Sequence, residues 1–147
     1  MEQKNKKINF ILKSNLGKKF VNLIMVNGKK NKAEHILLNI LTLLDKNAAD
    51  ILINSIKNVK PVMEVRSIRV RGRNFQVPLP LMKNRRTSLA IKWIIESARK
   101  KKGKSISIKL KDEILLAYQY QGDSVKKKIA IHDTAIANRA FLHFRWF

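Results

Sequence analysis

The arginines between residues 66 and 74 offer the clearest chemistry in the sequence. Arg66, Arg69, Arg71 and Arg73 lie close together, and Asn74 follows them directly. A guanidinium group presents a planar fork of donors that binds phosphate oxygens and also stacks on a nucleobase. A single run of charges is more often only a solvated surface. The stretch therefore predicts contact with a nucleic acid only if other parts of the chain agree.

Basic clusters recur at the junctions between the predicted elements. This recurrence favours a broadly positive surface over a single solvated face. Phosphate contacts of this kind release counterions, so the expected binding depends strongly on salt. Backbone N–H groups at helix starts add further donors for phosphate. The clusters are Lys29, Lys30 and Lys32; Lys83, Arg85 and Arg86; and Lys126 to Lys128.

The composition is that of a strongly basic chain that can still fold. Its 147 residues include 32 Lys and Arg against 10 Asp and Glu, which gives a net charge of +22. Such a charge destabilises a compact state unless an anionic partner neutralises it. Hydrophobic residues make up 45% of the chain, so it differs from a disordered basic tail. The length suits a single domain.

Patterns that would indicate catalysis or metal binding are absent from the sequence. The chain has no Cys, which excludes disulfides and thiolate sites. His35, His132 and His143 are scattered, and His132 and Asp133 would point about 100° apart on a helix. There is no glycine-rich phosphate loop. We expect no enzymatic activity, no cofactor, no metal and no transmembrane helix, which would need roughly 20 apolar residues.

The hydrophobic pattern predicts helices interrupted by one β-hairpin. Most segments repeat apolar residues at helical spacing, whereas residues 62–79 carry β-branched and aromatic residues that alternate near Gly72. The expected fold is mainly α, a bundle of about six helices with a protruding β-hairpin arm between the third and fourth. The predicted helices cover residues 20–26, 33–44, 50–59, 84–101, 110–121 and 124–144.

The predicted domain organisation is a short arm followed by one folded unit. Residues 1–19 form a basic arm without a sustained period, which we expect to order only on its partner. Residues 20–147 form a single helical domain. Candidate helix N-caps are Asn31, Asn84 and Ser124, whose side chains accept hydrogen bonds from free backbone N–H groups.

The apolar residues near the C-terminus allow two interpretations. In the last predicted helix, Ile129, Ile136 and Ala140 are expected to face inward, and Tyr118 is expected to be buried. The terminal aromatic residues are interleaved with His143 and Arg145, so packing and base stacking have equal weight for them. These aromatic residues are Phe141, Phe144, Trp146 and Phe147.

Several strings resemble the small-subunit ribosomal protein seven family. The most specific is NVKPVMEVRS at residues 58–67, followed by GRNFQVP at residues 72–78. The resemblance runs from about Phe20 to Trp146, which is most of the chain. Supporting matches are Gly28-Lys29-Lys30 before Ala33-Glu34, Arg85-Arg86 with Ala90 and Trp93, and ANRAFLHFRW at residues 137–146.

The resemblance implies a primary assembly protein that binds the 3′ (head) domain of small-subunit ribosomal RNA. In the family, the hairpin and a basic helical face grip an RNA junction, and the hairpin reaches toward the exit-site transfer RNA and the messenger RNA path. We also expect neighbouring head proteins as partners, a monomer within the particle and no membrane association. The matching RNA-binding positions are Lys29, Lys30, Lys32, Arg66, Arg69, Arg71, Arg73, Asn74, Arg85, Arg86, Lys92, Asn138, Arg139 and Arg145.

The N-terminal segment departs from the family pattern. Bacterial relatives begin with an Arg- and Pro-rich arm, whereas residues 1–19 are rich in Lys and Asn. The chain also contains 23 Lys, 18 Ile and 13 Asn, amino acids with A/T-rich codons. Together these features favour an organelle-encoded member, mitochondrial rather than plastid, with the bacterial cytoplasm as the other alternative.

Two rival functions fit the same basic composition. A nucleoid-type protein would bind DNA non-specifically by the same counterion release, and preference for RNA over duplex DNA would separate the two. An amphipathic basic helix can also lie on anionic lipid. The apolar stripes here fit a protein core better than a membrane surface.

Overall fold

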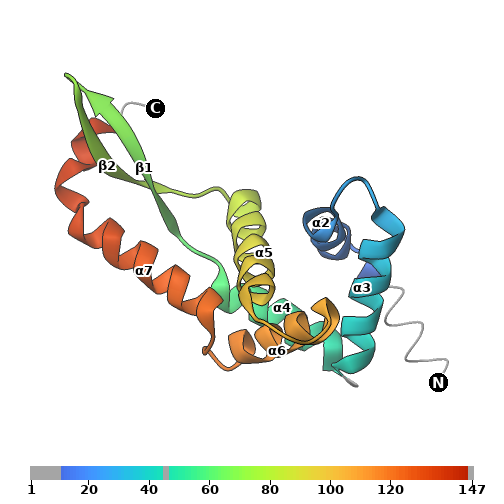
Figure 1. Cartoon of the computed structure of the whole chain (residues 1–147). Coiled ribbons are helices and arrows are strands. Elements are labelled where there is room, and N and C mark those ends of the chain that lie inside the picture. Colours follow the sequence, from blue (N-terminus) through green and yellow to red (C-terminus); the bar gives the residue numbers. More distant parts are fainter. Residues whose placement is uncertain (1–10, 45–46, 146–147) are drawn as a thin grey trace.

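Helices and one β-hairpin form most of the chain in a computed structural model, which describes residues 11–44 and 47–145. The mainly α fold with a hairpin between the third and fourth predicted helices is confirmed, because the hairpin lies between α4 and α5 (Figure 1). The elements are α2 (Asn15–Ile24), α3 (Lys30–Leu43), α4 (Ala48–Val59), β1 (Met63–Val70), β2 (Arg73–Pro80), α5 (Lys83–Lys100), α6 (Ile106–Tyr118), α7 (Asp123–Ala137) and the 3-10 helix η2 (Arg139–Phe144).

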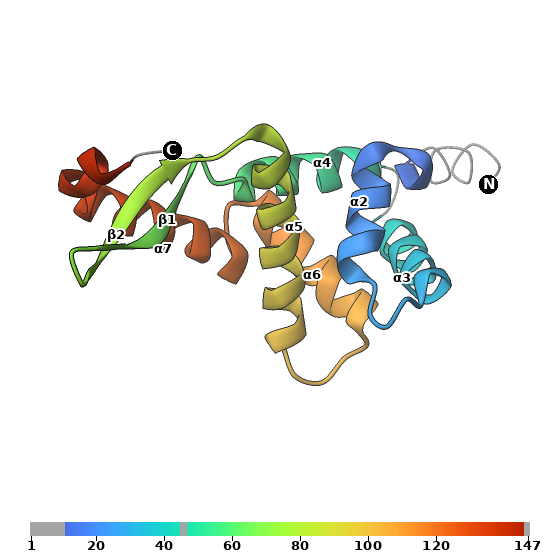
Figure 2. The ribbon, with the colours of Figure 1, turned by 90° about the horizontal axis from the view of Figure 1, so that it is seen from above.

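The hydrophobic core is built by the helices α2 to α6. Phe20, Leu37, Leu52, Ile91 and Ile114, one from each of these helices, are fully buried. Burying each such side chain contributes roughly 1.5–3 kcal/mol. Helix α6 packs against α3, α4 and α5, and Figure 2 shows α5 between the α2–α3 pair and the hairpin. The core thus provides a rigid body from which the hairpin projects.

Helix α2 begins before the predicted boundary of the basic arm. It starts at Asn15, where Ser14 Oγ accepts a hydrogen bond from the Gly17 N–H at 3.1 Å. Leu16 and Ile11 pack against the core. Residues 11–19 therefore belong to the helical body, which corrects the expectation of an unordered arm over this part. Residues 1–10 lie outside the described residues.

The predicted N-caps are each displaced from the observed helix starts. Helices α3, α5 and α7 begin one residue before the proposed caps, and Asn31, Asn84 and Ser124 all lie inside the helices. For α7 the reason is Gly122, whose φ of +100° places the chain reversal directly before Asp123. Sequence reasoning located these helices but not their first residues.

The long C-terminal helix that we predicted is two elements with a different buried face. Helix α7 ends at Ala137, where the Asn138 side chain donates to the Thr134 carbonyl at 2.9 Å, and η2 follows. Ile129 and Ile136 are 53% and 63% exposed, so the inward orientation was wrong. The prediction also fails for Ala140, which is exposed, and for Tyr118, which is 45% exposed.

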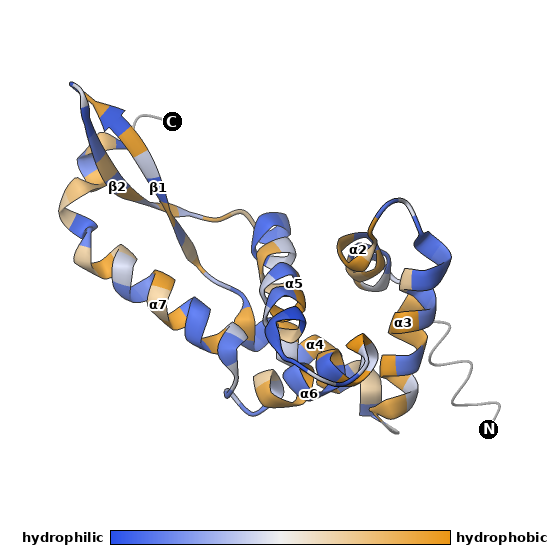
Figure 3. Ribbon diagram, in the orientation of Figure 1, coloured by the Kyte–Doolittle hydropathy of each residue, from blue (hydrophilic) through white to orange (hydrophobic). Residues whose placement is uncertain are grey.

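The physical reason is that α7 leaves the core. Figure 1 shows it extending from the helical body alongside the hairpin, and it packs against β1 there. Only Val125, at its start, belongs to the main core, while Ala135 is buried further along. Figure 3 shows hydrophobic and hydrophilic residues mixed along α7. In the described ranges no helix combines the length and apolarity needed to span a membrane.

Candidate nucleic-acid interface

The hairpin ends in a two-residue turn that sets the direction of its arginines. Val70 pairs with Arg73, so Arg71 and Gly72 form the turn, with φ angles of +47° and +81°. Two positive φ angles define a type I′ turn, whose twist matches that of the flanking strands. Glycine adopts this geometry freely, whereas Arg71 bears a cost of about 1 kcal/mol. The hairpin thus tolerates local strain at its tip.

The hairpin tip, residues 69–74, exposes its cations. Arg69 lies opposite Asn74 in the register, and Arg71 and Arg73 flank Gly72. All of these side chains are exposed. Among the described residues the arginine ion pairs involve Arg66 and Arg85 and none at the tip. The tip guanidinium groups are therefore free to bind an anion.

Glu64 connects the inner end of the hairpin to α5. Its carboxylate accepts from Arg66 Nε at 2.8 Å and from Arg85 Nε at 3.1 Å, and only 13% of its side chain is exposed. The carboxylate holds two guanidinium groups, one on β1 and one in the first turn of α5, in a fixed arrangement. Sequence reasoning named both arginines but did not predict that Glu64 joins them.

His132 connects α7 to the start of the hairpin. Its Nε2 accepts a hydrogen bond from the Val62 N–H at 3.1 Å, which requires the neutral imidazole. Burial and the neighbouring Lys128 lower the pKa of His132, while Asp133 opposes them. Lys128 also donates to the Asn58 carbonyl at 2.8 Å. His132 is thus a partly buried structural contact between α7 and the hairpin.

An aromatic cluster joins η2 to strand β2. The Phe75 ring centroid lies 5.2 Å from that of Phe141 and 4.9 Å from that of Phe144, at tilted angles typical of aromatic packing. Both rings are partly buried. Packing is therefore the role of these two residues, which decides between the two interpretations left open above. Trp146 and Phe147 lie outside the described residues.

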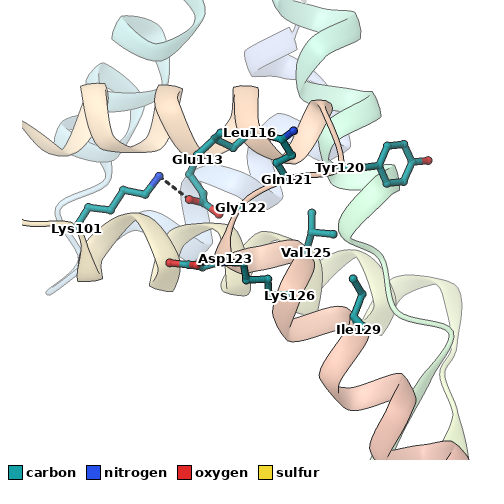
Figure 4. Close-up of a pocket in the computed structure, with 10 residues that line it drawn as sticks. All are labelled: Lys101, Glu113, Leu116, Tyr120, Gln121, Gly122, Asp123, Val125, Lys126 and Ile129. Atoms are coloured by element: carbon teal, nitrogen blue, oxygen red, sulfur yellow. Dashed lines mark ion pairs between the residues drawn. The ribbon is translucent and has the colours of Figure 1, made fainter.

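A buried carboxylate fixes the start of α7. Glu113 on α6 is fully buried and accepts from the backbone N–H and the hydroxyl of Ser124, at 3.1 and 2.8 Å. Lys101 Nζ lies 2.6 Å from its other oxygen, as Figure 4 shows. A Cβ at Gly122 would lie 3.0 Å from the Glu113 carboxylate, so glycine is needed here for space as well as for its positive φ. Helix α7 thus leaves the body at a defined position.

The remaining predicted RNA-binding residues lie in separate parts of the structure. Lys29, Lys30 and Lys32 are exposed at the start of α3, and Figures 1 and 2 place this region on the far side of α5 from the hairpin. The structure does bring Arg145 beside Arg66 and Arg85 at the inner end of the hairpin.

The other predicted residues differ in what they contact. Arg86 Nε donates to the Leu81 carbonyl at 2.8 Å, so its side chain supports the β2–α5 connection. Asn138 contacts the end of α7, as described above. Lys92 on α5 and Arg139 on η2 are exposed. Lys127, from the basic cluster at the start of α7, is paired with Glu96 at 2.8 Å.

Comparison with known proteins identifies the family. The family model described as ribosomal protein S7p/S5e matches residues 2–139. The chain belongs to this family. Its role is that of a structural protein of the small ribosomal subunit, and the nucleoid alternative is not favoured.

Several S7-family proteins are similar over most of their length. The chain is 48% identical over 132 residues to the small ribosomal subunit protein uS7 of Petrotoga mobilis, covering 87% of this chain and 85% of the relative. It is 45% identical over 137 residues to the protein of the same name from Buchnera aphidicola, covering 90% and 88%. The Thermotoga neapolitana protein is 44% identical over 132 residues, covering 87% and 85%.

Proposed function

We propose that the protein binds the 3′ domain of small-subunit ribosomal RNA and nucleates assembly of the head of that subunit. Family membership supports ribosomal RNA as the partner. The observation that carries the proposal is the hairpin tip, whose exposed guanidinium groups stand on a hairpin fastened to α5, α7 and η2. Such preorganisation lowers the entropy lost when the cations bind phosphate.

The start of α5 supports the same surface. Lys83, Arg85 and Arg86 lie in its first turn, where no acidic residue is present. Cations at a helix N-terminus are unfavourable by roughly 0.3–1 kcal/mol each, because the helix dipole is positive there. An RNA phosphate would relieve this repulsion and accept from the free backbone N–H groups. Glu64 already offsets this repulsion at Arg85, so the unfavourable arrangement that RNA would relieve is chiefly that of Lys83.

The proposed interface extends beyond the hairpin. We assign phosphate contacts to the exposed cations, with the lysines at the start of α3 as a second contact region on the other side of α5. Contacts with neighbouring head proteins, proximity to exit-site transfer RNA and the messenger path, and a monomeric state in the particle complete the proposal. The proposed residues are Lys29, Lys30, Lys32, Arg66, Arg69, Arg71, Arg73, Asn74, Arg85, Arg86, Lys92, Asn138, Arg139 and Arg145.

Binding to RNA across a salt series tests this function. The purified chain is titrated with a transcript of the 3′ domain, a scrambled transcript and duplex DNA. We expect tight binding to the native transcript that survives competitor RNA and weakens when Arg69, Arg71 and Arg73 are changed to Ala. A charge-matched control changes the exposed residues Lys57, Lys100 and Lys102 to Ala. Equal affinity for all three nucleic acids, or equal losses in both triple variants, would contradict the proposal.

We also propose that the protein has no catalytic activity and acts in a mitochondrial ribosome. The excess of Lys, Ile and Asn supports an A/T-rich organelle genome, whereas the relatives named above are bacterial and support the bacterial cytoplasm. Cell fractionation followed by detection of the chain in mitochondrial or cytosolic ribosomes separates the two locations.

A further inference from the structure

A pocket of about 520 Å³ lies at the inner end of the hairpin. Strand β1, the end of β2, the β2–α5 connection and Arg145 surround it. Its volume falls within the range of roughly 300–1,000 Å³ that is typical of small-ligand sites.

The floor of the pocket is apolar. Leu79 and Leu81 are each 6% exposed, and Pro80 lies between them. Met82 also lines the pocket and is 84% exposed, an unusual position for a large apolar side chain. A methionine thioether is flexible and polarisable, so it adapts to flat aromatic surfaces. The floor therefore suits a planar, apolar-faced group.

The rim of the pocket is cationic, and Glu64 holds two of its three arginines. Arg66, Arg85 and Arg145 line it together with Glu64. Glu64 occupies Nε of Arg66, which leaves the two terminal nitrogens of that guanidinium without a protein partner among the described residues. Three positive charges against one negative charge favour an anionic ligand. Met82, the N-cap of α5, supplies no side-chain cap, so backbone donors of the first turn lie at the same place.

We propose that this pocket holds one unpaired RNA nucleotide, with its nucleobase on the Met82 and Pro80 floor and its phosphate on the arginine rim. The proposal rests on the proposed function and adds to it a defined subsite and the state of the nucleotide bound there. A paired nucleobase is covered on both faces in a helix, whereas an unpaired one can be splayed out into a pocket. A planar guanidinium such as that of Arg145 can cover the second face of the nucleobase.

Photocrosslinking from the floor of the pocket tests the proposal. A photoreactive amino acid replaces Met82, and the full chain is irradiated with the 3′-domain transcript, with an unstructured single-stranded RNA and with duplex RNA. A chain labelled at the exposed Lys57 is the control. We expect one dominant crosslink to an unpaired nucleotide of the transcript and crosslinking to the single strand but not to the duplex. Equal crosslinking to single strand and duplex, or crosslinks from Met82 no more specific than those from Lys57, would overturn the proposal.

Affinity measurements with two Met82 variants give a second readout. Met82→Asp places a negative charge in the pocket and should weaken the affinity for single-stranded RNA about tenfold. Met82→Leu keeps an apolar floor, so its affinity for single-stranded RNA should stay near that of the wild type. Because Met82 is exposed and aspartate is a favourable N-cap, neither variant should melt below the wild-type temperature. Unchanged affinity of Met82→Asp would overturn the proposal. Whether the wild-type chain distinguishes the native from the scrambled transcript reports separately on the proposed function. Tighter binding of an acidic peptide than of single-stranded RNA would overturn the nucleotide subsite and indicate a protein partner instead.

Discussion

Replacing Glu113 with Gln tests how the buried carboxylate positions α7. Glutamine keeps an oxygen acceptor for Ser124 but removes the charge beside Lys101, which lies 2.6 Å away. Removing one partner of a buried ion pair costs roughly 3–5 kcal/mol. Because the Lys101 side chain is 30% exposed and can turn toward water, we expect a smaller loss of about 2 kcal/mol.

Replacing Glu113 with Ala should cost about 4 kcal/mol, because the backbone N–H and hydroxyl of Ser124 lose their acceptor as well. The assay is urea unfolding, with thermal melting as a check, where the Glu113→Gln variant should melt about 4–8 °C lower. The control is Glu96→Gln, which breaks the exposed pair with Lys127 and should cost at most about 0.5 kcal/mol. Equal stability of the Glu113→Gln and Glu96→Gln variants would show that the buried charge of Glu113 does not stabilise the start of α7.

Three further predictions concern the hairpin and its supports. Changing Arg69, Arg71 and Arg73 together to Ala should reduce the slope of log affinity against log salt by about 2–3 units, measured by filter binding across a salt series. The pKa of His132 is lowered below 6.5 in the folded state, so its stabilising contribution is complete above that value and is lost as the pH falls toward the folded pKa. His132→Gln should remove this loss in urea titrations at neutral and at mildly acidic pH, and an unchanged pH dependence would contradict the assignment. Gly72→Val should strain the turn by about 1–2 kcal/mol, which weakens RNA binding while leaving the melting of the helical core near wild type, as circular dichroism would show.

The features that sequence reasoning predicted well are local ones. The alternation around Gly72 is a short-range signal, and the hairpin lies where it indicated. The helical period in residues 33–44 places Leu37, Ile40 and Leu41 on one face, and all three are fully buried. These signals require no knowledge of the rest of the fold.

The features that sequence reasoning missed depend on distant contacts. Glu64 meets an arginine 21 residues away, and His132 meets a backbone N–H 70 residues away. A single polar residue carries no periodic signal, so only the fold reveals its partner. Ile129 and Ile136 share one face of α7, but whether that face is covered depends on where the helix leaves the core.

Sedimentation of the chain with ribosomes tests whether it is a component of the small subunit that contacts the 3′ domain. The chain is tagged in the organism that encodes it, and the ribosomal subunits are separated on a sucrose gradient under high salt. The small-subunit RNA that the tagged chain contacts is then mapped by crosslinking. We expect the chain to travel with the small subunit and its hairpin crosslinks to map to the 3′ domain. The chain would not be a specific 3′-domain protein if it left the particle under salt that retains other small-subunit proteins, or if its crosslinks spread over all RNA domains.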